Sequence, residues 1–173
     1  LYDYASATKD DLNFEKGDLL EVLKEDQDWW HARHLGNGQE GYVPSNYIAE
    51  EDSLDKEDWY HGNIPRRDTE KLLQQPGTVR GTFLIRESET AKGSCQFSMS
   101  VMDEDSQRGR IVKHYRIRNM DSGGYYITTR KCFDSLHDLV AHYSQSADGL
   151  CHKLVRPCAK NKPEMWDLSR STR

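Results

Sequence analysis

The sequence has 173 residues, of which 35% are hydrophobic and 31% charged, and its net charge at pH 7 is −5. These proportions are typical of globular proteins and exclude a collagen-like or low-complexity chain. No apolar run approaches the roughly 20 residues that cross a bilayer, so the sequence predicts no membrane span.

Charge is divided unevenly along the chain. Residues 1–52 contain 4 Lys or Arg and 13 Asp or Glu, whereas residues 59–173 contain 19 and 13. The polar stretch at residues 51–57 therefore predicts a linker between two domains. An acidic first unit and a basic second unit favour partners of opposite charge.

The first unit is predicted to be a small all-β barrel. Strand-like alternation occurs at residues 19–24, 29–34 and 41–44, with turn-forming glycines between the runs. Short strands joined by tight turns are typical of such barrels.

Alternation also predicts which aromatic side chains of this unit are exposed. Trp30 and Ala32 share a strand face, so we expect Trp30 in the core and Trp29 in solvent. By the same rule Val43 faces inward and Pro44 outward. The alternative is that the rings simply pack over a small core. A large exposed aromatic patch indicates a binding surface, and an aromatic ridge suits a polyproline II ligand. The predicted patch comprises Tyr2, Tyr4, Trp29, Tyr42, Pro44 and Tyr47.

Residues 1–4, 28–30 and 41–47 resemble, in order and spacing, the signature segments of an SH3 domain covering residues 1–50. The resemblance implies an SH3 barrel whose groove binds proline-rich ligands. It also implies that Asp11 lies opposite a ligand arginine. The implied groove residues are Tyr2, Tyr4, Asp11, Trp29, Pro44, Asn46 and Tyr47.

The second unit is predicted to be an α+β domain. Pro65 precedes a helix-like stretch, and strand-like runs follow at residues 82–87, 96–102, 111–118 and 125–129. A second helix is predicted by one apolar stripe with Ser135 as its cap. The stripe consists of Leu136, Leu139, Val140 and Tyr143.

A cation stands inside the apolar run at residues 82–87. Arg86 requires a carboxylate or an anionic ligand there, because burial of an unpaired charge is costly. Ser88, His114, Arg116 and Arg66 supply further donors, and we expect few acidic partners among them. Such a set favours a dianionic phosphate.

Three alternatives remain for these donors. Arg86 could extend into water, or it could pair with Glu70 or Asp68. The basic and aromatic run at residues 113–118 could instead bind nucleic acid, although the modest positive charge and the acidic first unit disfavour this.

Residues 58–62, 81–88, 113–115 and 148–151 strongly resemble an SH2 domain covering residues 58–158, which has a central antiparallel sheet flanked by two helices. The resemblance implies that Arg86 grips a phosphotyrosine phosphate and that Arg66 stacks on the ring. The implied phosphotyrosine pocket comprises Arg86, Arg66, Ser88, Thr90, His114 and Arg116. The residues implied to set peptide specificity are Tyr115, Ile127, Thr128, Tyr143 and Leu150.

The order of the two domains, with residues 86–90 and 121–127, resembles the Src family of non-receptor tyrosine kinases, with features of a Frk-like or invertebrate member. Residues 159–173 would then begin the linker toward a kinase domain. The resemblance implies that the SH2 domain holds a phosphorylated C-terminal tail or other phosphotyrosine proteins. The SH3 domain would hold the SH2–kinase linker or proline-rich proteins. The alternative is an SH3–SH2 adaptor without a kinase domain.

No kinase motif occurs in the sequence, so we expect no catalysis by this part of the protein. No cofactor is expected here, and ATP and Mg would belong only to a kinase domain. No metal is expected, because the four cysteines lack zinc-site spacing. We expect the protein in the cytoplasm, at the inner face of the plasma membrane if an N-terminal region anchors it.

Overall fold

The computed structural model describes residues 1–6, 8–89 and 95–163. The chain divides into two compact units, which are described separately. Unit 1 contains Leu1–Lys56 and the described residues from Asn161, and unit 2 contains Glu57–Lys160. No helix of the described residues is long and apolar enough to cross a membrane.

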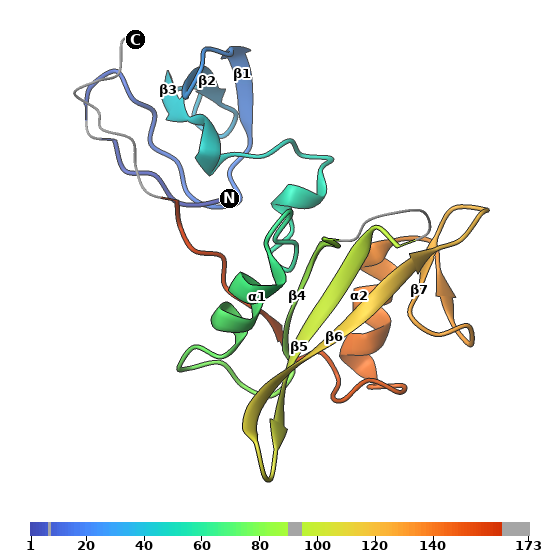
Figure 1. Cartoon of the computed structure of the whole chain (residues 1–173). Coiled ribbons are helices and arrows are strands. Elements are labelled where there is room, and N and C mark those ends of the chain that lie inside the picture. The colour runs from blue at the N-terminus through green and yellow to red at the C-terminus, as the bar shows by residue number, and fades with distance from the viewer. Residues whose placement is uncertain (7, 90–94, 164–173) are drawn as a thin grey trace. The chain divides into compact units, whose positions relative to one another are not determined.

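Unit 1 is built on a three-stranded antiparallel sheet in which β2 is central (Figure 1). Ala32 of β2 lies opposite Val22 on one side and Gly41 on the other. Isolated bridges from Tyr4 and Asp11 bring the first part of the chain into this unit. Its elements are β1 (Leu20–Lys24), β2 (Trp29–His34), β3 (Glu40–Pro44) and the 3₁₀ turns η1 (Ser45–Tyr47) and η2 (Leu54–Lys56).

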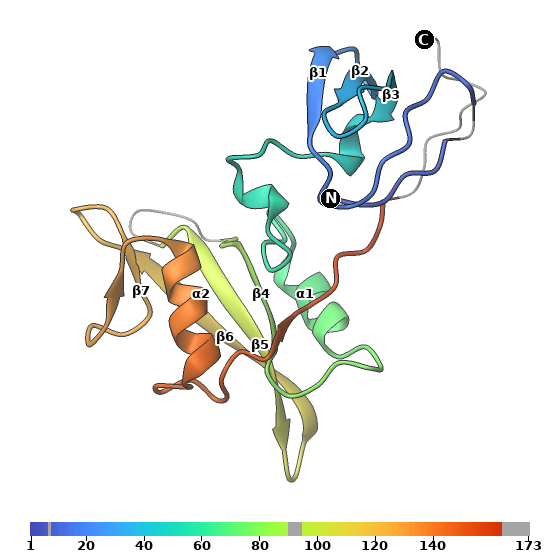
Figure 2. The same ribbon diagram turned by 180° about the vertical axis from the view of Figure 1, so that it is seen from behind.

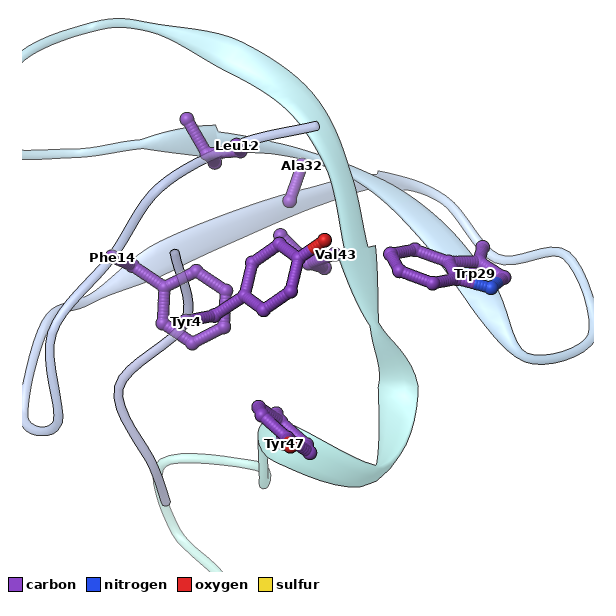
Figure 3. Close-up of a cluster of buried hydrophobic side chains, with 7 residues drawn as sticks. All are labelled: Tyr4, Leu12, Phe14, Trp29, Ala32, Val43 and Tyr47. Carbon is purple, nitrogen blue, oxygen red and sulfur yellow. The ribbon is translucent and has the colours of Figure 1, made fainter. Parts of the chain in front are cut away.

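The core of unit 1 is rich in aromatic rings. Ala32 and Val43 are fully buried, as the alternation of β2 and β3 predicts. Figure 3 shows the seven core side chains, with Tyr4 in the middle and Trp29 at the edge of the cluster. They are Tyr4, Leu12, Phe14, Trp29, Ala32, Val43 and Tyr47.

The expected exposure of Trp29 is wrong. Trp29 is only 6% exposed, whereas Trp30 is partly exposed and donates its Nε1–H to the Gln27 carbonyl at 3.1 Å. The alternation of side chains predicts which face of a sheet a residue points to, but not whether another segment covers that face. Here Tyr4, from outside the sheet, packs edge-on against Trp29 with ring centroids 6.0 Å apart.

Pro44, Tyr4 and Tyr47 were also expected at the surface, and all three are buried. Tyr2 and Tyr42 are partly exposed, as a surface ridge requires. The rings therefore pack over the small core as well as toward its surface. The exposure of the aromatic rings alone therefore does not locate a binding groove in unit 1.

Unit 2 is an α+β unit with a six-stranded sheet in the order β8-β7-β6-β5-β4-β9. All neighbouring strands are antiparallel except β9, which runs parallel to β4. Figures 1 and 2 show α1 and α2 on opposite sides of the sheet. The helices are α1 (Arg66–Leu73) and α2 (Leu136–Gln145). The strands are β4 (Thr82–Glu87), β5 (Phe97–Asp105), β6 (Gly109–Asn119), β7 (Tyr125–Tyr126), β8 (Cys132–Phe133) and β9 (Arg156–Pro157).

The start of α2 confirms the predicted cap. Ser135 Oγ accepts a hydrogen bond from the Asp138 backbone N–H at 3.0 Å, which satisfies a donor in the first helical turn. Leu136, Leu139 and Tyr143 are buried along one stripe, while Val140 is partly exposed. This stripe holds α2 against the sheet.

The α1 side of the sheet has its own apolar cluster. Leu72 and Leu73 of α1 pack with Leu84 of β4 and with Met102 of β5. Since side chains alternate along a strand, Arg86 points to the same face as Leu84. The fold thus places this cation on the side of the sheet that α1 covers.

Glycine at position 81 is required by both conformation and space. Gly81 has φ of +91°, and a Cβ there would lie 2.7 Å from the Lys153 carbonyl oxygen. We predict that Gly81→Ala destabilises unit 2 by about 2 kcal/mol or more. Urea unfolding followed through amide NMR signals of β4 and β5 measures this loss.

The matched control is Gly109→Ala. Gly109 has φ of +72° but nothing within 4 Å of an added Cβ, so only the backbone cost of about 1 kcal/mol applies. Equal losses for the two variants would contradict the close approach at Gly81.

Candidate functional sites

The predicted donors of unit 2 gather on one face of the sheet. Arg86 of β4 lies opposite Ser98 of β5, which lies opposite Arg116 of β6. In the row two residues away, Ser100 lies opposite His114. Since residues two apart share a face, Arg86, His114 and Arg116 point to the same side.

Arg86 is a buried cation with an unused donor. The residue is 4% exposed, and its Nε has no hydrogen-bond partner among the described residues. Within the described part of the chain its guanidinium donates a long hydrogen bond, 3.5 Å from Nη1 to the Glu87 carbonyl. Burial lowers the pKa of Arg86, and the nearby Glu89 carboxylate partly offsets this. An anion that entered here would satisfy both the charge and the donor.

Arg66 lies at the first residue of α1, with its side chain 61% exposed. Its Nε donates to Glu70 Oε1 at 3.2 Å, one helical turn along. Its backbone N–H donates to the Glu89 carboxylate. The Arg66 side chain is thus oriented by a residue of its own helix.

His114 joins β6 to both neighbouring elements. Its Nε2 lies 2.9 Å from Glu70 Oε1 of α1, and its Nδ1 lies 2.7 Å from Ser100 Oγ of β5. Burial lowers the pKa of His114, so the ring is neutral at pH 7. A neutral ring fits these contacts when Nε2–H donates to Glu70 and the Ser100 hydroxyl donates to Nδ1.

One carboxylate of the described residues is shared by two of these donors. Glu70 accepts from both Arg66 and His114. Among the described residues no ion pair is recorded between Arg86 and Glu70 or Asp68, the two carboxylates considered for it. Glu70 follows Arg66 by four residues, a spacing at which helical side chains meet, so the sequence contained this signal.

Two of the remaining predicted pocket residues, Ser88 and Arg116, lie near the same end of β4. Ser88 follows that strand, and its backbone N–H donates to Gln96 at 2.8 Å. Arg116 is exposed on β6. Thr90 lies outside the described residues.

Tyr115 occupies the other face of β6 from its neighbour His114. Its hydroxyl accepts the backbone N–H of Cys151 at 2.8 Å, and burial raises its pKa. Tyr115 is therefore held by the loop that contains Leu150.

The other predicted specificity residues come from α2 and two loops. Tyr143 and Leu150 are buried, while Ile127 and Thr128 are partly exposed. Burial raises the pKa of Tyr143, whose hydroxyl has no hydrogen-bond partner in the described part of the chain. A polar group of a bound ligand could therefore reach this hydroxyl.

Asp148 connects the two loops. Its carboxylate lies 2.9 Å from His142 Nε2 and 3.7 Å from Arg130 Nη2. The hydrogen bond from His142 lowers the pKa of Asp148. Sequence reasoning missed all three residues, because their partners are known only once the loops are placed.

In unit 1, the predicted groove residues make polar contacts in two places. The Tyr4 hydroxyl donates to Asp11 Oδ2 at 2.8 Å, and Asp11 is 8% exposed. The buried Asn46 Oδ1 has no hydrogen-bond partner among the residues that are described. Pro44 lies opposite Trp29 in the β2–β3 register.

Tyr2 and Tyr47 contact the chain that follows unit 2. The Tyr2 hydroxyl donates to the Asn161 carbonyl and the Tyr47 hydroxyl to the Pro163 carbonyl, each at 3.2 Å. Lys162 Nζ lies over the Tyr47 ring, 5.2 Å from its centroid. Aromatic hydroxyls that donate to carbonyls of a proline-containing segment are suited to peptide binding.

Comparison with protein-family models gives two matches. Residues 1–45 match the SH3 domain and residues 59–143 match the SH2 domain. The chain carries an SH3 domain followed by an SH2 domain. The predicted fold class, an SH3 barrel followed by an α+β SH2 domain, is thereby confirmed. These are non-catalytic modules that bind proline-rich and phosphotyrosine peptides, respectively.

The neutral His114 ring predicts a pH dependence of the SH2 domain. The unfolded chain binds a proton at His114 near pH 6.5, whereas the folded domain binds it only at lower pH. The neutral His114 ring therefore adds its full contribution to the free energy of unfolding above pH 6.5, and this contribution decreases as the pH falls below that value. We predict that His114→Gln flattens the stability profile between pH 7.5 and 5.5, about one unit either side of the reference pKa.

Urea unfolding at several pH values, followed through β5 and β6 amide signals, measures this effect. His31→Gln, in the SH3 domain, is the control and should leave the SH2 profile unchanged. A His114→Gln profile as steep as that of the wild type would contradict the neutral, buried ring.

Proposed function

We propose that this chain is the regulatory and targeting part of a non-receptor protein tyrosine kinase of the Src family. Its SH2 domain binds phosphotyrosine peptides, including the phosphorylated C-terminal tail of its own protein. Its SH3 domain binds proline-rich segments, including the linker after the SH2 domain. Together they hold an ATP- and Mg-dependent kinase domain inactive and recruit its substrates, in the cytoplasm or at the inner face of the plasma membrane.

The unused donor of Arg86 carries the phosphotyrosine part of this proposal. A buried guanidinium whose Nε has no acceptor among the described residues favours a ligand that brings its own two negative charges. Arg66 at the exposed rim lies where it can stack on the ring of an incoming side chain. Phosphoserine has a shorter side chain, so it should not reach Arg86.

The contacts of Tyr2 and Tyr47 support the part of the proposal that concerns the linker. Asn161, Lys162 and Pro163 belong to the same compact unit as the SH3 domain. Two groove tyrosines donate to the backbone carbonyls of this segment, and its lysine lies over an aromatic face. A segment held by so few contacts is replaceable by a stronger ligand, which would shift the population toward the active kinase.

An adaptor without a kinase domain is the alternative function. Both peptide-binding sites would serve it equally, because an adaptor also joins phosphotyrosine and proline-rich partners. The segment at Asn161–Pro163 favours the kinase, since an adaptor does not require its SH3 groove to hold its own chain.

Phosphate recognition by Arg86 is tested with a peptide that carries acidic and then aliphatic residues after phosphotyrosine. We predict that Arg86→Lys weakens binding by about 100-fold, because a lysine keeps the charge but lacks the planar pair of donors. Isothermal titration calorimetry of the whole chain measures the affinity.

The matched control is Arg108→Lys, in the exposed β5–β6 turn, which should bind as the wild type does. The unphosphorylated peptide should not bind to any of these chains. Binding that is indifferent to both phosphate and Arg86 would remove the phosphotyrosine function.

The internal segment is tested by competition. We predict that Lys162→Ala combined with Pro163→Ala makes an added proline-rich peptide bind about threefold to tenfold more tightly, because the groove no longer holds a competitor. Lys24→Ala, at the exposed end of β1, is the control for loss of one positive charge. An unchanged affinity would show that the segment does not compete for the groove.

A further inference from the structure

Two donors of the phosphate pocket have the same acceptor. Arg66 Nε lies 3.2 Å and His114 Nε2 lies 2.9 Å from the same Oε1 atom of Glu70. Arg66 and Glu70 come from α1, whereas His114 comes from β6. Glu70 therefore fixes a helix residue and a sheet residue relative to each other.

The Glu70 side chain is 41% exposed, and the side chain of His114 is only 12% exposed. The two donors lower the pKa of Glu70, with His114 as the larger cause. The acceptor thus remains ionised at neutral pH, as a stable partner for both donors requires.

Charged groups from two elements act on His114. Arg66 and Glu70 lie on α1, and Arg86 lies on β4. Ser100 of β5 contributes only its hydroxyl, at 2.7 Å. Burial and the two arginines disfavour a positive ring, whereas Glu70 favours one. A substitution of Glu70 therefore changes the pKa of His114 while the donors Arg66 and Arg86 keep their own side chains.

We propose that Glu70 is a positioning residue of the phosphotyrosine pocket, a carboxylate that orients the Arg66 guanidinium and the His114 ring for the incoming phosphotyrosine. Glu70 acts through these two residues and is not itself a ligand of the phosphate. This inference rests on the proposed phosphotyrosine function of the SH2 domain.

The proposal follows from the cost of ordering side chains. A free arginine side chain at a helix end occupies many rotamers, and each must be given up when the ligand binds. The contact with Glu70 restricts Arg66 before the ligand arrives. It also selects the His114 tautomer that carries hydrogen on Nε2, because the ionised Glu70 carboxylate can only accept, which leaves Nδ1 to accept from the Ser100 hydroxyl. Both restrictions reduce the entropy lost on binding.

The test uses the whole chain with Glu70→Ala, Glu70→Gln and a control, Asp68→Ala. Asp68 is an exposed acid in the first turn of the same helix, so it controls for lost charge and for helix stability. Titration with the phosphotyrosine peptide should show binding about tenfold weaker for Glu70→Ala. Glu70→Gln keeps an acceptor oxygen and should recover most of this loss. Asp68→Ala should bind as the wild type does.

Two further measurements separate positioning from a general effect on α1. The NMR titration of His114 in the free chain should give a lower pKa in Glu70→Gln than in the wild type, since the carboxylate favours the charged ring. Adding Glu70→Ala to a chain that already carries Arg66→Ala and His114→Gln should weaken binding no further.

Each contrary result has a distinct meaning. If Glu70→Ala binds as tightly as the wild type or more tightly, the carboxylate does not position the donors. If it weakens the doubly substituted chain equally, Glu70 acts through the helix alone. If the wild type binds no phosphotyrosine peptide, the proposed function itself fails, while the His114 titration still decides whether Glu70 holds the ring.

Discussion

The desolvation of one guanidinium constrains the arrangement of the SH2 domain. Arg86 follows the buried apolar residues Phe83, Leu84 and Ile85 of β4, and it is only 4% exposed. A cation there is tolerable only if the neighbouring elements leave a route for an anion to reach it. Ser98 opposite it on β5, rather than a large apolar residue, provides a small polar neighbour on that face. The polar part of this face, beside the apolar cluster of α1, follows from that one requirement.

Much of the SH2 fold could be predicted from local sequence patterns. The apolar run of β4 and the stripe and cap of α2 depend on neighbours within one segment, and the structure has them where the patterns indicate. Strands β8 and β9 were missed. Each has only two residues, and a pair of residues has no periodicity that could distinguish it from a loop. Their pairing depends on the rest of the sheet being in place.

The site was predicted less completely, for physical reasons that differ between the two domains. In the SH2 domain, the donors are recognisable because cations in apolar strands are unusual, but the partner of His114 comes from a distant helix. In the SH3 domain, alternation failed for Trp29 because the core is closed by rings from outside the sheet. A barrel this small has too few residues for the core and the binding surface to be separate sets. Tyr47 combines both, with its ring in the core and its hydroxyl on the Pro163 backbone carbonyl.

Two consecutive residues of β6 point to opposite faces of the sheet, where the proposed function gives them different ends of the same ligand. His114 contacts Glu70 on the α1 side, and Tyr115 contacts the loop at Cys151 on the opposite side. Because the side-chain period of a strand is two, one inserted or deleted residue within β6 would exchange these faces and disable both at once. A change in length at the β5–β6 turn leaves the pairing of the following residues intact. The β5–β6 hairpin can thus differ in length without exchanging these two faces, whereas the strand beyond it accommodates substitutions more readily than insertions or deletions.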